Sequence, residues 1–317
     1  MRVDFCLLTA IGIDHWLGEP PEPVHPVVWI GRSISAVSRG IPWGEPRSEG
    51  WYGLLMAVAI PLAWMVGIRA MVRAASARGR IPGFLVAAWL LKSAFALRKL
   101  DEAARDVQLA LAARDLSTAR RAVARLVSRP VDELDERQVT SAAVESVAEN
   151  TADSVVGPWL SYALCGLPGA VGYRAVNTLD SMIGYHGRYE QVGNAAARLD
   201  DLLNLVPSRL AGLYLVLSAW STGADARGAW RVMFRDQGLT ASPNAGWPMA
   251  AMAGALGVRL EKLGHYRLNG AAREPRAEDI LRSLVIMRRA AWWAAGAALA
   301  VRALRPGREG TGRWTAI

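Results

Sequence analysis

Long apolar runs recur along the chain, and short charged segments separate them. Residues 51–68 contain no formal charge, and neither do residues 155–173. Each run approaches the roughly 20 residues that a helix needs to cross a bilayer. Residues 81–97 form a similar run interrupted only by Lys92, and shorter runs occupy 210–224 and 290–300. A soluble fold could bury one such helix but not four or five, so the pattern predicts an all-α, polytopic helical membrane protein.

Between these runs, apolar residues recur at helical spacing over shorter distances. An amphipathic helix outside the bilayer is predicted by Leu97, Leu100, Ala104, Val107 and Leu111. A second helix is expected to start at Ser117 and to end at Pro130. Asp132 or Asp135 is then expected to cap a third helix that runs toward Asp153. No segment alternates for long as a strand does, which agrees with the all-α class.

Composition supports the membrane class and narrows the partners. Apolar and aromatic residues make up 52% of the chain, charged residues only 21%, and the mean hydropathy is +0.15. The net charge of +9 needs no nucleic acid, because basic residues at membrane edges explain it and no nucleic-acid-binding motif is present. The connector 69–80 carries only basic charges, which predicts a cytoplasmic location. Two lone cysteines, Cys6 and Cys165, exclude a disulfide scaffold.

The N-terminal segment and the absence of repeats indicate how the chain is divided into domains. Residues 5–13 predict a short buried or interfacial helix, because Asp4 interrupts the basic region of a signal peptide and no cleavage site follows. No internal repeat is visible, so we expect residues 1–317 to form a single membrane-embedded domain.

The richest polar segment is AAVESVAENTADSVVGP, residues 142–158. Glu145, Glu149 and Asp153 recur every four residues, which places three carboxylates along one stripe of a helix. Like charges at this spacing repel, so solvent, an arginine or a divalent cation must offset them. Because the stripe leads into an apolar run, where unpaired carboxylates are costly, we favour Mg²⁺ over a solvated acidic face. The opposite stripe is apolar and is expected to pack: Val139, Ala143 and Val147.

A second polar segment is GYRAVNTLDSMIGYHGRY, residues 172–189. It places Asn177, Asp180 and Ser181 within about one helical turn. The flanking cations and histidine are Arg174, His186 and Arg188. An equal alternative is that Asn177 or Thr178 caps a helix. An isolated histidine such as His186 is more typical of a protein surface than of a catalytic site.

A third segment, ARLDDLLNLVPSRL, covers residues 197–210. Asp200 and Asn204 share one helical face, while Asp201 shares a face with Arg198, which leaves an internal ion pair as an alternative. Adjacent acids, an amide and Arg209 at the start of an apolar run suggest an ion or phosphate site.

Two further segments contain candidate binding residues. Residues 13–32 gather four prolines around His25, which predicts a rigid extended loop. Residues 242–262 place Asn244 just before a helix N-terminus, where free N–H groups can receive an anion; a plain capped turn is the alternative.

The run 155–173 raises a topological question. A single crossing would leave the carboxylate stripe and the Asn177 segment on opposite sides of the membrane. The run holds many helix breakers, and a turn near Leu167-Pro168-Gly169 would return the chain to the same side. We therefore favour a re-entrant hairpin, or polar groups buried in a shared cavity, over a simple crossing.

Taken in order, these segments closely resemble the CbiB/CobD family of cobalamin biosynthesis, the adenosylcobinamide-phosphate synthases. The matching blocks are LGEPPEPVHPVVWIGR, ESVAENTADSVVGP, YRAVNTLDSMIGY, AARLDDLLNLVPSRL and SPNAGWPMAAMAGALGVRL. One departure is Ser128-Arg129-Pro130, where the family usually shows an Arg-Asp pair; any role of that acid would require Asp132 to substitute.

The resemblance implies a multi-pass enzyme of the inner (cytoplasmic) membrane. Such an enzyme would attach (R)-1-amino-2-propanol, or its O-phosphate, to the free carboxylate of adenosylcobyric acid, with ATP as co-substrate and Mg²⁺ as cofactor. The corrinoid is a substrate, membrane lipid surrounds the chain, and other late cobalamin-pathway membrane enzymes are candidate partners. On this basis the acids Glu145, Glu149, Asp180 and Asp201 are the expected catalytic residues. The expected metal ligands are Glu145, Glu149, Asp153 and Asp200. The expected substrate and phosphate contacts are His25, Asn150, Arg174, Asn177, Ser181, Arg188, Asn204, Arg209 and Asn244.

Two other classes of protein use similar features. A transporter also places acids and broken helices within the membrane, but its halves usually repeat, and no repeat is found here. A non-catalytic membrane sensor on the same scaffold is the second alternative, and the retention of every acidic block argues against it.

Overall fold

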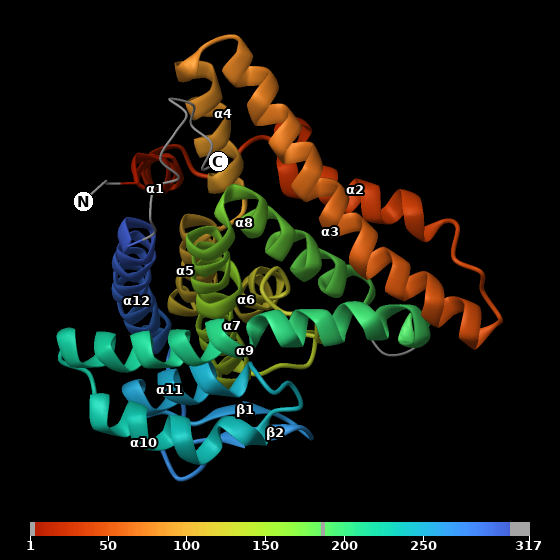
Figure 1. Ribbon diagram of the computed structural model, residues 1–317. Helices are drawn as coiled ribbons and strands as arrows, with labels where there is room; N and C mark the ends of the chain where they lie inside the picture. The colour runs from red at the N-terminus through yellow and green to blue at the C-terminus, as the bar shows by residue number, and fades with distance from the viewer. Residues whose placement is uncertain (1–3, 185–187, 305–317) are drawn as a thin grey trace. The chain divides into compact units, whose positions relative to one another are not determined.

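The computed structural model describes residues 4–184 and 188–304 (Figure 1). Its helices are α1 (Phe5–Leu17), α2 (Pro26–Ser38), α3 (Pro46–Ala77), α4 (Arg80–Ser93), α5 (Leu97–Ala112), α6 (Leu116–Val123), α7 (Glu136–Thr151), α8 (Gly157–Ile183), α9 (Glu190–Ser221), α10 (Ala226–Asp236), α11 (Gly246–Leu256) and α12 (Ala277–Leu304). Short helical turns lie at Glu22–Val24, Ala152–Val156 and Gln237–Leu239, and two strands, β1 (Leu260–Lys262) and β2 (Tyr266–Leu268), form an antiparallel hairpin.

The predicted class is confirmed: the protein is an all-α, polytopic membrane protein. Within the described residues, five helical stretches are long and apolar enough to cross a membrane. They are Pro46–Ala77, Arg80–Ala112, Glu136–Ile183, Glu190–Ser221 and Ala277–Leu304. Each contains one of the five predicted apolar runs, apart from the last few residues of the run at 210–224.

The described chain forms two compact units. Unit 1 contains residues 4–96, 157–184, 188–203 and 296–304, and unit 2 contains residues 97–156 and 204–295. Both units are therefore assembled from segments that are distant in sequence.

In unit 1, α3 packs along α8, and α1 packs against α4. Helix α8 reverses direction at Gly166, whose φ of 69° and ψ of −166° lie outside the helical region (Figure 1). A side chain on Gly157 would collide with the Tyr173 hydroxyl, so the two arms come together at a distance that a straight helix would not allow. The prediction that 155–173 folds back is confirmed, with the turn one residue before Leu167.

Unit 2 is built around α7, which contacts α5, α6, α11 and β1. Asp135 caps the N-terminus of α7 and forms a capping box with Gln138. The sequence predicted Asp132 or Asp135 as this cap, and the structure shows the second. Every residue from 139 to 148 is buried. A helix enclosed on all sides favours small side chains, and the predicted apolar stripe through Ala143 packs as expected.

Four local expectations are corrected. The helix predicted from Ser117 starts at Leu116 under an Asp115 cap and ends at Val123, well before Pro130. The run 81–97 is not one helix, because α4 ends at Ser93. The proline-rich segment is only partly extended, since α2 starts at Pro26. The β-hairpin was not predicted, because three-residue strands are too short to show alternation.

Candidate functional site

Glu145, the first carboxylate of the stripe, lies in a buried polar network in unit 2. Ser141 donates a hydrogen bond to its Oε1 at 2.6 Å. Arg129 and Tyr266 both donate to its Oε2, at 3.0 and 2.8 Å. Glu145 is only 4% exposed, so both oxygens are satisfied away from solvent. The sequence left three ways to offset the charge of these carboxylates: solvent, an arginine or a divalent cation. At Glu145 the structure shows an arginine.

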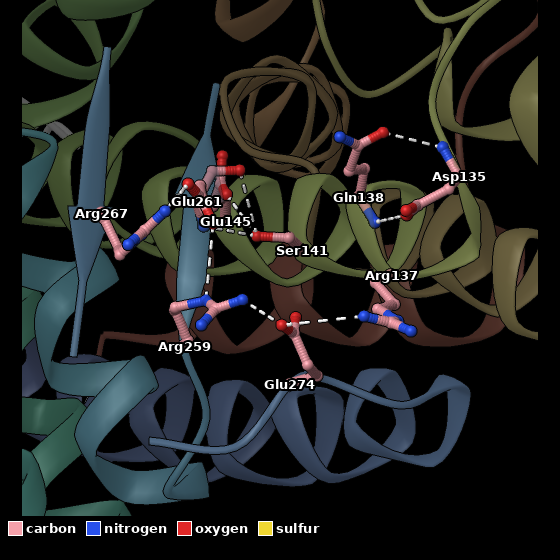
Figure 2. A network of polar contacts seen from close by, with 9 residues as sticks. All are labelled: Asp135, Arg137, Gln138, Ser141, Glu145, Arg259, Glu261, Arg267 and Glu274. Carbon is pink, nitrogen blue, oxygen red and sulfur yellow. Dashed lines mark hydrogen bonds and ion pairs between the residues drawn. The ribbon is translucent and has the colours of Figure 1, made fainter. Parts of the chain in front are cut away.

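The β-hairpin completes this network. Ser141 also accepts a hydrogen bond from the Glu261 backbone N–H at 2.8 Å, which ties β1 to α7 (Figure 2). Burial, and then the negative charge of Glu145, raise the pKa of Tyr266, and Glu149 acts in the same direction. The Tyr266 hydroxyl therefore stays protonated and donates to the carboxylate.

The other two carboxylates of the stripe lie in different environments. Glu149 is exposed, whereas Asp153 is half-buried and lies in the π-helical turn Ala152–Val156. A π turn adds a residue to the helical repeat, so it rotates Asp153 away from the direction that an ideal α-helix would give. Asn150 bonds locally: its amide donates to the Ser146 carbonyl at 3.0 Å and accepts from Ser154 at 2.9 Å.

Arg129 and Tyr266 were missed as site residues. The segment Ser128-Arg129-Pro130 attracted notice only for an absent acid, yet its arginine pairs with Glu145, and both side chains are largely buried. The stripe of acids without nearby cations was the signal that could have indicated such partners, because a buried carboxylate requires a cation or hydrogen-bond donors.

In unit 1, α8 and α9 bring two predicted polar segments together. Arg174 donates to the Asn177 side-chain carbonyl at 3.1 Å, and the Asn177 amide donates to Asp200 Oδ1 at 3.4 Å. Arg174, Asn177 and Asp200 are all half-buried. The chain reversal at Gly166 and the return through α9 thus create an arginine–amide–carboxylate relay from residues that are 26 positions apart in sequence at most.

The remaining acids and hydroxyl of these segments flank the relay in sequence. Asp180 and Asp201 are half-buried, and Ser181 is exposed. Ser181 donates to the Asn177 backbone carbonyl at 2.8 Å, a common helix-surface bond. His186 lies outside the described residues.

A second amide cluster lies in unit 2 between α9 and the start of α11. Ser208 donates to the Asn244 side-chain oxygen at 3.2 Å, and Arg209 approaches the same oxygen at 3.4 Å. The Arg209 guanidinium also lies over the Trp247 ring, 4.9 Å from its centroid. Asn204, one turn earlier on α9, is buried. The predicted segments at 197–210 and 242–262 therefore meet.

His25 belongs to a buried ionic cluster in unit 1. Its Nε2 pairs with Glu19 at 2.8 Å, and Lys92, which is fully buried, pairs with Glu19 at 2.7 Å and with Asp14 at 3.3 Å. Burial raises the pKa of Glu19, but hydrogen bonds from His25 and Lys92 outweigh it and set the pKa below its usual 4.5. His25 Nδ1 accepts from the Val27 N–H at 3.2 Å and so caps α2.

Arg188, in unit 1, contacts an aromatic ring. Its guanidinium stacks on Trp43 at 4.5 Å from the ring centroid, and Trp43 also packs against Tyr189. When a guanidinium group stacks on an aromatic ring, its N–H donors still point outward in the plane of the guanidinium. They therefore remain available to bind an anion.

A hollow of about 140 Å³ lies beside the N-terminal half of α7, and Figure 2 shows charged residues of its lining. Arg259 pairs there with Glu261 and Glu274, and Arg137 lies 3.9 Å from Glu274. Its cations are therefore neutralised by its own acids.

No described group of three or more His, Cys, Asp or Glu side chains is gathered for a metal ion. The oxygen donors of Glu149, Asp153 and Asp200 are nevertheless of the type that Mg²⁺ takes, with one or two carboxylates per ion and the rest from water and phosphate.

Comparison with known proteins gives a single family. The family model described as CobD/Cbib protein matches residues 7–290. Proteins named "Cobalamin biosynthesis protein CobD" are similar over most of their length. The one from Dehalococcoides mccartyi is 39% identical over 290 residues, covering 92% of this chain and 94% of the relative. The Rhodobacter capsulatus protein is 43% identical, covering 90% and 92%. The Klebsiella pneumoniae protein is 38% identical, covering 91% and 93%.

No solved structure matches the chain. The family model and these relatives agree with each other and span almost every segment described above. The chain belongs to the CobD/CbiB family.

Proposed function

We propose that this protein acts in cobalamin biosynthesis as an adenosylcobinamide-phosphate synthase of the inner membrane. It would join (R)-1-amino-2-propanol, or its O-phosphate, to the free propionate carboxylate of adenosylcobyric acid at the expense of ATP. The observation that carries this proposal is the match of the family model to residues 7–290, together with similar proteins that are named for cobalamin biosynthesis.

A carboxylate must be activated before an amine can attack it. In the proposed reaction, a propionate oxygen attacks the terminal phosphorus of ATP, which gives an acyl phosphate and ADP. The ammonium group loses one proton to a base and, as a neutral amine, attacks the acyl carbon. Phosphate leaves with the electron pair of the broken C–O bond, and the nitrogen loses a second proton to the base or to solvent to give the neutral amide. Positioning and charge neutralisation carry most of the catalysis in phosphoryl transfer.

The chain's polar residues suit the phosphoryl step. We assign Glu149 and Asp153 in unit 2 and, separately, Asp200 in unit 1 as candidate Mg²⁺ ligands; an ion bound to either set would neutralise phosphate charge. Glu145 is assigned a supporting role instead, because Arg129, Ser141 and Tyr266 already occupy both of its oxygens. The proposed phosphate contacts are Arg174, Arg188 and Arg209.

The acyl-transfer step requires a base and groups that orient the substrates. Asp180 and Asp201 are the proposed bases, since both are half-buried carboxylates that flank the relay in sequence. The amides and the hydroxyl are assigned to orient substrate: Asn150, Asn177, Ser181, Asn204 and Asn244. His25, which Glu19 holds in the cluster that includes Lys92, is also assigned to contact substrate.

Turnover by the detergent-purified protein tests the proposal. Adenosylcobyric acid, aminopropanol or its phosphate, and Mg²⁺ are supplied with and without ATP, and the corrinoid is followed by mass spectrometry. A mass gain that matches the amide and requires both ATP and Mg²⁺ is expected. A corrinoid that binds without being converted contradicts a self-sufficient ligase, and absence of both binding and turnover contradicts the assignment.

A further inference from the structure

Helix α10 presents an unusual outer face. Residues 228, 229, 232, 233 and 236 are buried, and they pack the helix against α11. The residues on the opposite side are exposed: Arg227, Trp230, Arg231, Phe234 and Arg235. This short helix is amphipathic, but its solvent side carries large aromatic rings.

The aromatic rings form a continuous exposed strip. Trp230 is 50% exposed and Phe234 49%, and their ring centroids lie 4.6 Å apart. Phe234 also contacts Trp247 edge to face at 5.6 Å. Leu239, in the turn that follows α10, is also 51% exposed. Single exposed apolar residues are common, but a strip of this kind marks an interaction surface.

Arginines line one side of the aromatic strip. Arg227, Arg231 and Arg235 recur every four residues, so their side chains lie in one row. Arg235 pairs with Asp236 at 2.6 Å, whereas no ion pair in the described part of the chain involves Arg227 or Arg231. Asp236 is the one acid of α10, and it is buried. The exposed face is therefore positively charged as well as aromatic.

The chain leads into this face directly from a membrane-length helix. Helix α9 ends at Ser221, and only residues 222–225 separate it from α10. Trp220, at the end of α9, is 73% exposed. Tryptophan and arginine are enriched where a membrane helix reaches the headgroup region, because the indole ring prefers the interface and the guanidinium binds phosphate.

We propose that the outer face of α10 lies in the membrane interface and binds anionic phospholipid headgroups. Trp230, Phe234 and Leu239 would insert at the acyl boundary, while Arg227 and Arg231 contact headgroup phosphates. Charge complementarity and the short link to α9 favour a lipid surface over a second copy of this chain, whose same face would bring like charges together. This inference does not depend on the proposed reaction.

Spin-label accessibility in nanodiscs tests the placement. The full chain carries Cys165→Ser, which removes the exposed native thiol and leaves the buried Cys6. One nitroxide is attached through Trp230→Cys and another, in a separate variant that keeps both rings, through Leu239→Cys. Arg121→Cys on the exposed surface of α6 is the matched control.

We expect labels at 230 and 239 to collide with oxygen and to be shielded from an aqueous nickel chelate, with the reverse at 121. Arg227→Gln/Arg231→Gln should weaken binding of phosphatidylglycerol, measured by native mass spectrometry, by roughly 10-fold or more, since each arginine near an anionic surface adds to its attraction for the headgroups. Arg114→Gln/Arg121→Gln removes the same charge and should leave binding unchanged.

Three results would overturn the proposal. Nickel access at 230 and 239 would show an aqueous surface. Shielding from both reagents, with dipolar broadening between labels, would show a contact between two copies. Equal loss of lipid binding in the two double variants would show a general charge effect rather than a site on α10.

Discussion

Removal of the Arg129 charge should strongly destabilise unit 2. Arg129→Met keeps most of the side-chain volume but leaves the Glu145 carboxylate buried without its cation. Breaking a buried ion pair by removing one partner typically costs about 3–5 kcal/mol. The Glu145 side chain is 6% exposed and the Arg129 side chain 14%, so solvent offers little compensation.

The remaining donors limit this cost. Ser141 and Tyr266 still bond to the carboxylate, and hydrogen bonds to a charged group contribute about 1.5–3 kcal/mol each. We therefore expect Arg129→Met to lower the free energy of unfolding by about 3 kcal/mol, at the low end of the range. Glu145→Gln should cost less, because the charge that it leaves unpaired is that of Arg129, whose side chain is the more exposed of the two at 14%.

Equilibrium unfolding in detergent, with SDS as the denaturant, measures these values. The double variant Arg129→Met/Glu145→Gln completes a thermodynamic cycle, and a coupling energy of about 1–3 kcal/mol is expected for two residues in contact. Arg125→Met, which removes an arginine paired with Asp106 at the exposed surface, is the matched control and should cost less than about 1 kcal/mol. If Arg129→Met costs no more than this control, the network does not depend on the ion pair and our reasoning is wrong.

Three further predictions concern activity, pH and the chain reversal. Asp200→Asn should reduce turnover by about 100-fold or more while Asn177 keeps a hydrogen-bond partner, whereas wild-type turnover at saturating Mg²⁺ would contradict a role for the carboxylate. Because the pKa of Glu19 is lower in the folded state than its usual 4.5, its contribution to stability is complete above that value and is lost as the pH falls through the folded pKa. Thermal unfolding from pH 7 to pH 3 should therefore show a smaller loss for Glu19→Gln than for the wild type, and an unchanged profile would refute the argument; exposed Glu22→Gln serves as the control. Gly166→Ala should destabilise by about 1–2 kcal/mol because φ is 69° there, whereas Gly67→Ala in α3, with open space around it, should be neutral or stabilising in the same unfolding assay.

Local patterns were enough to predict much of the architecture. Uncharged runs of membrane length identify spanning helices because desolvated backbone must bond within its own helix. Asp135 marks the start of α7 because its side chain accepts a hydrogen bond from the Gln138 N–H three residues away. The density of helix breakers around Leu167 predicted the reversal, since glycine at positive φ and proline both interrupt a helix.

The environments of the acidic residues depended on contacts distant in sequence. Glu145 and Glu149 occupy equivalent positions in the pattern, yet one is buried and the other exposed, because α7 is enclosed at the turn that carries Glu145. Its partner Tyr266 lies 121 residues away, in a hairpin too short to leave a strand signal.

The sequence by itself therefore determined the membrane class, the start of α7 and the family, since these follow from spacing and motifs within a few turns of chain. Only the tertiary structure decided which carboxylate receives an arginine, which amide bridges Arg174 to Asp200, and which face of α10 is left uncovered. The physical reason is that burial and pairing are properties of surfaces brought together by folding, and side chains such as Arg129 and Glu145 acquire their partners only when distant helices pack.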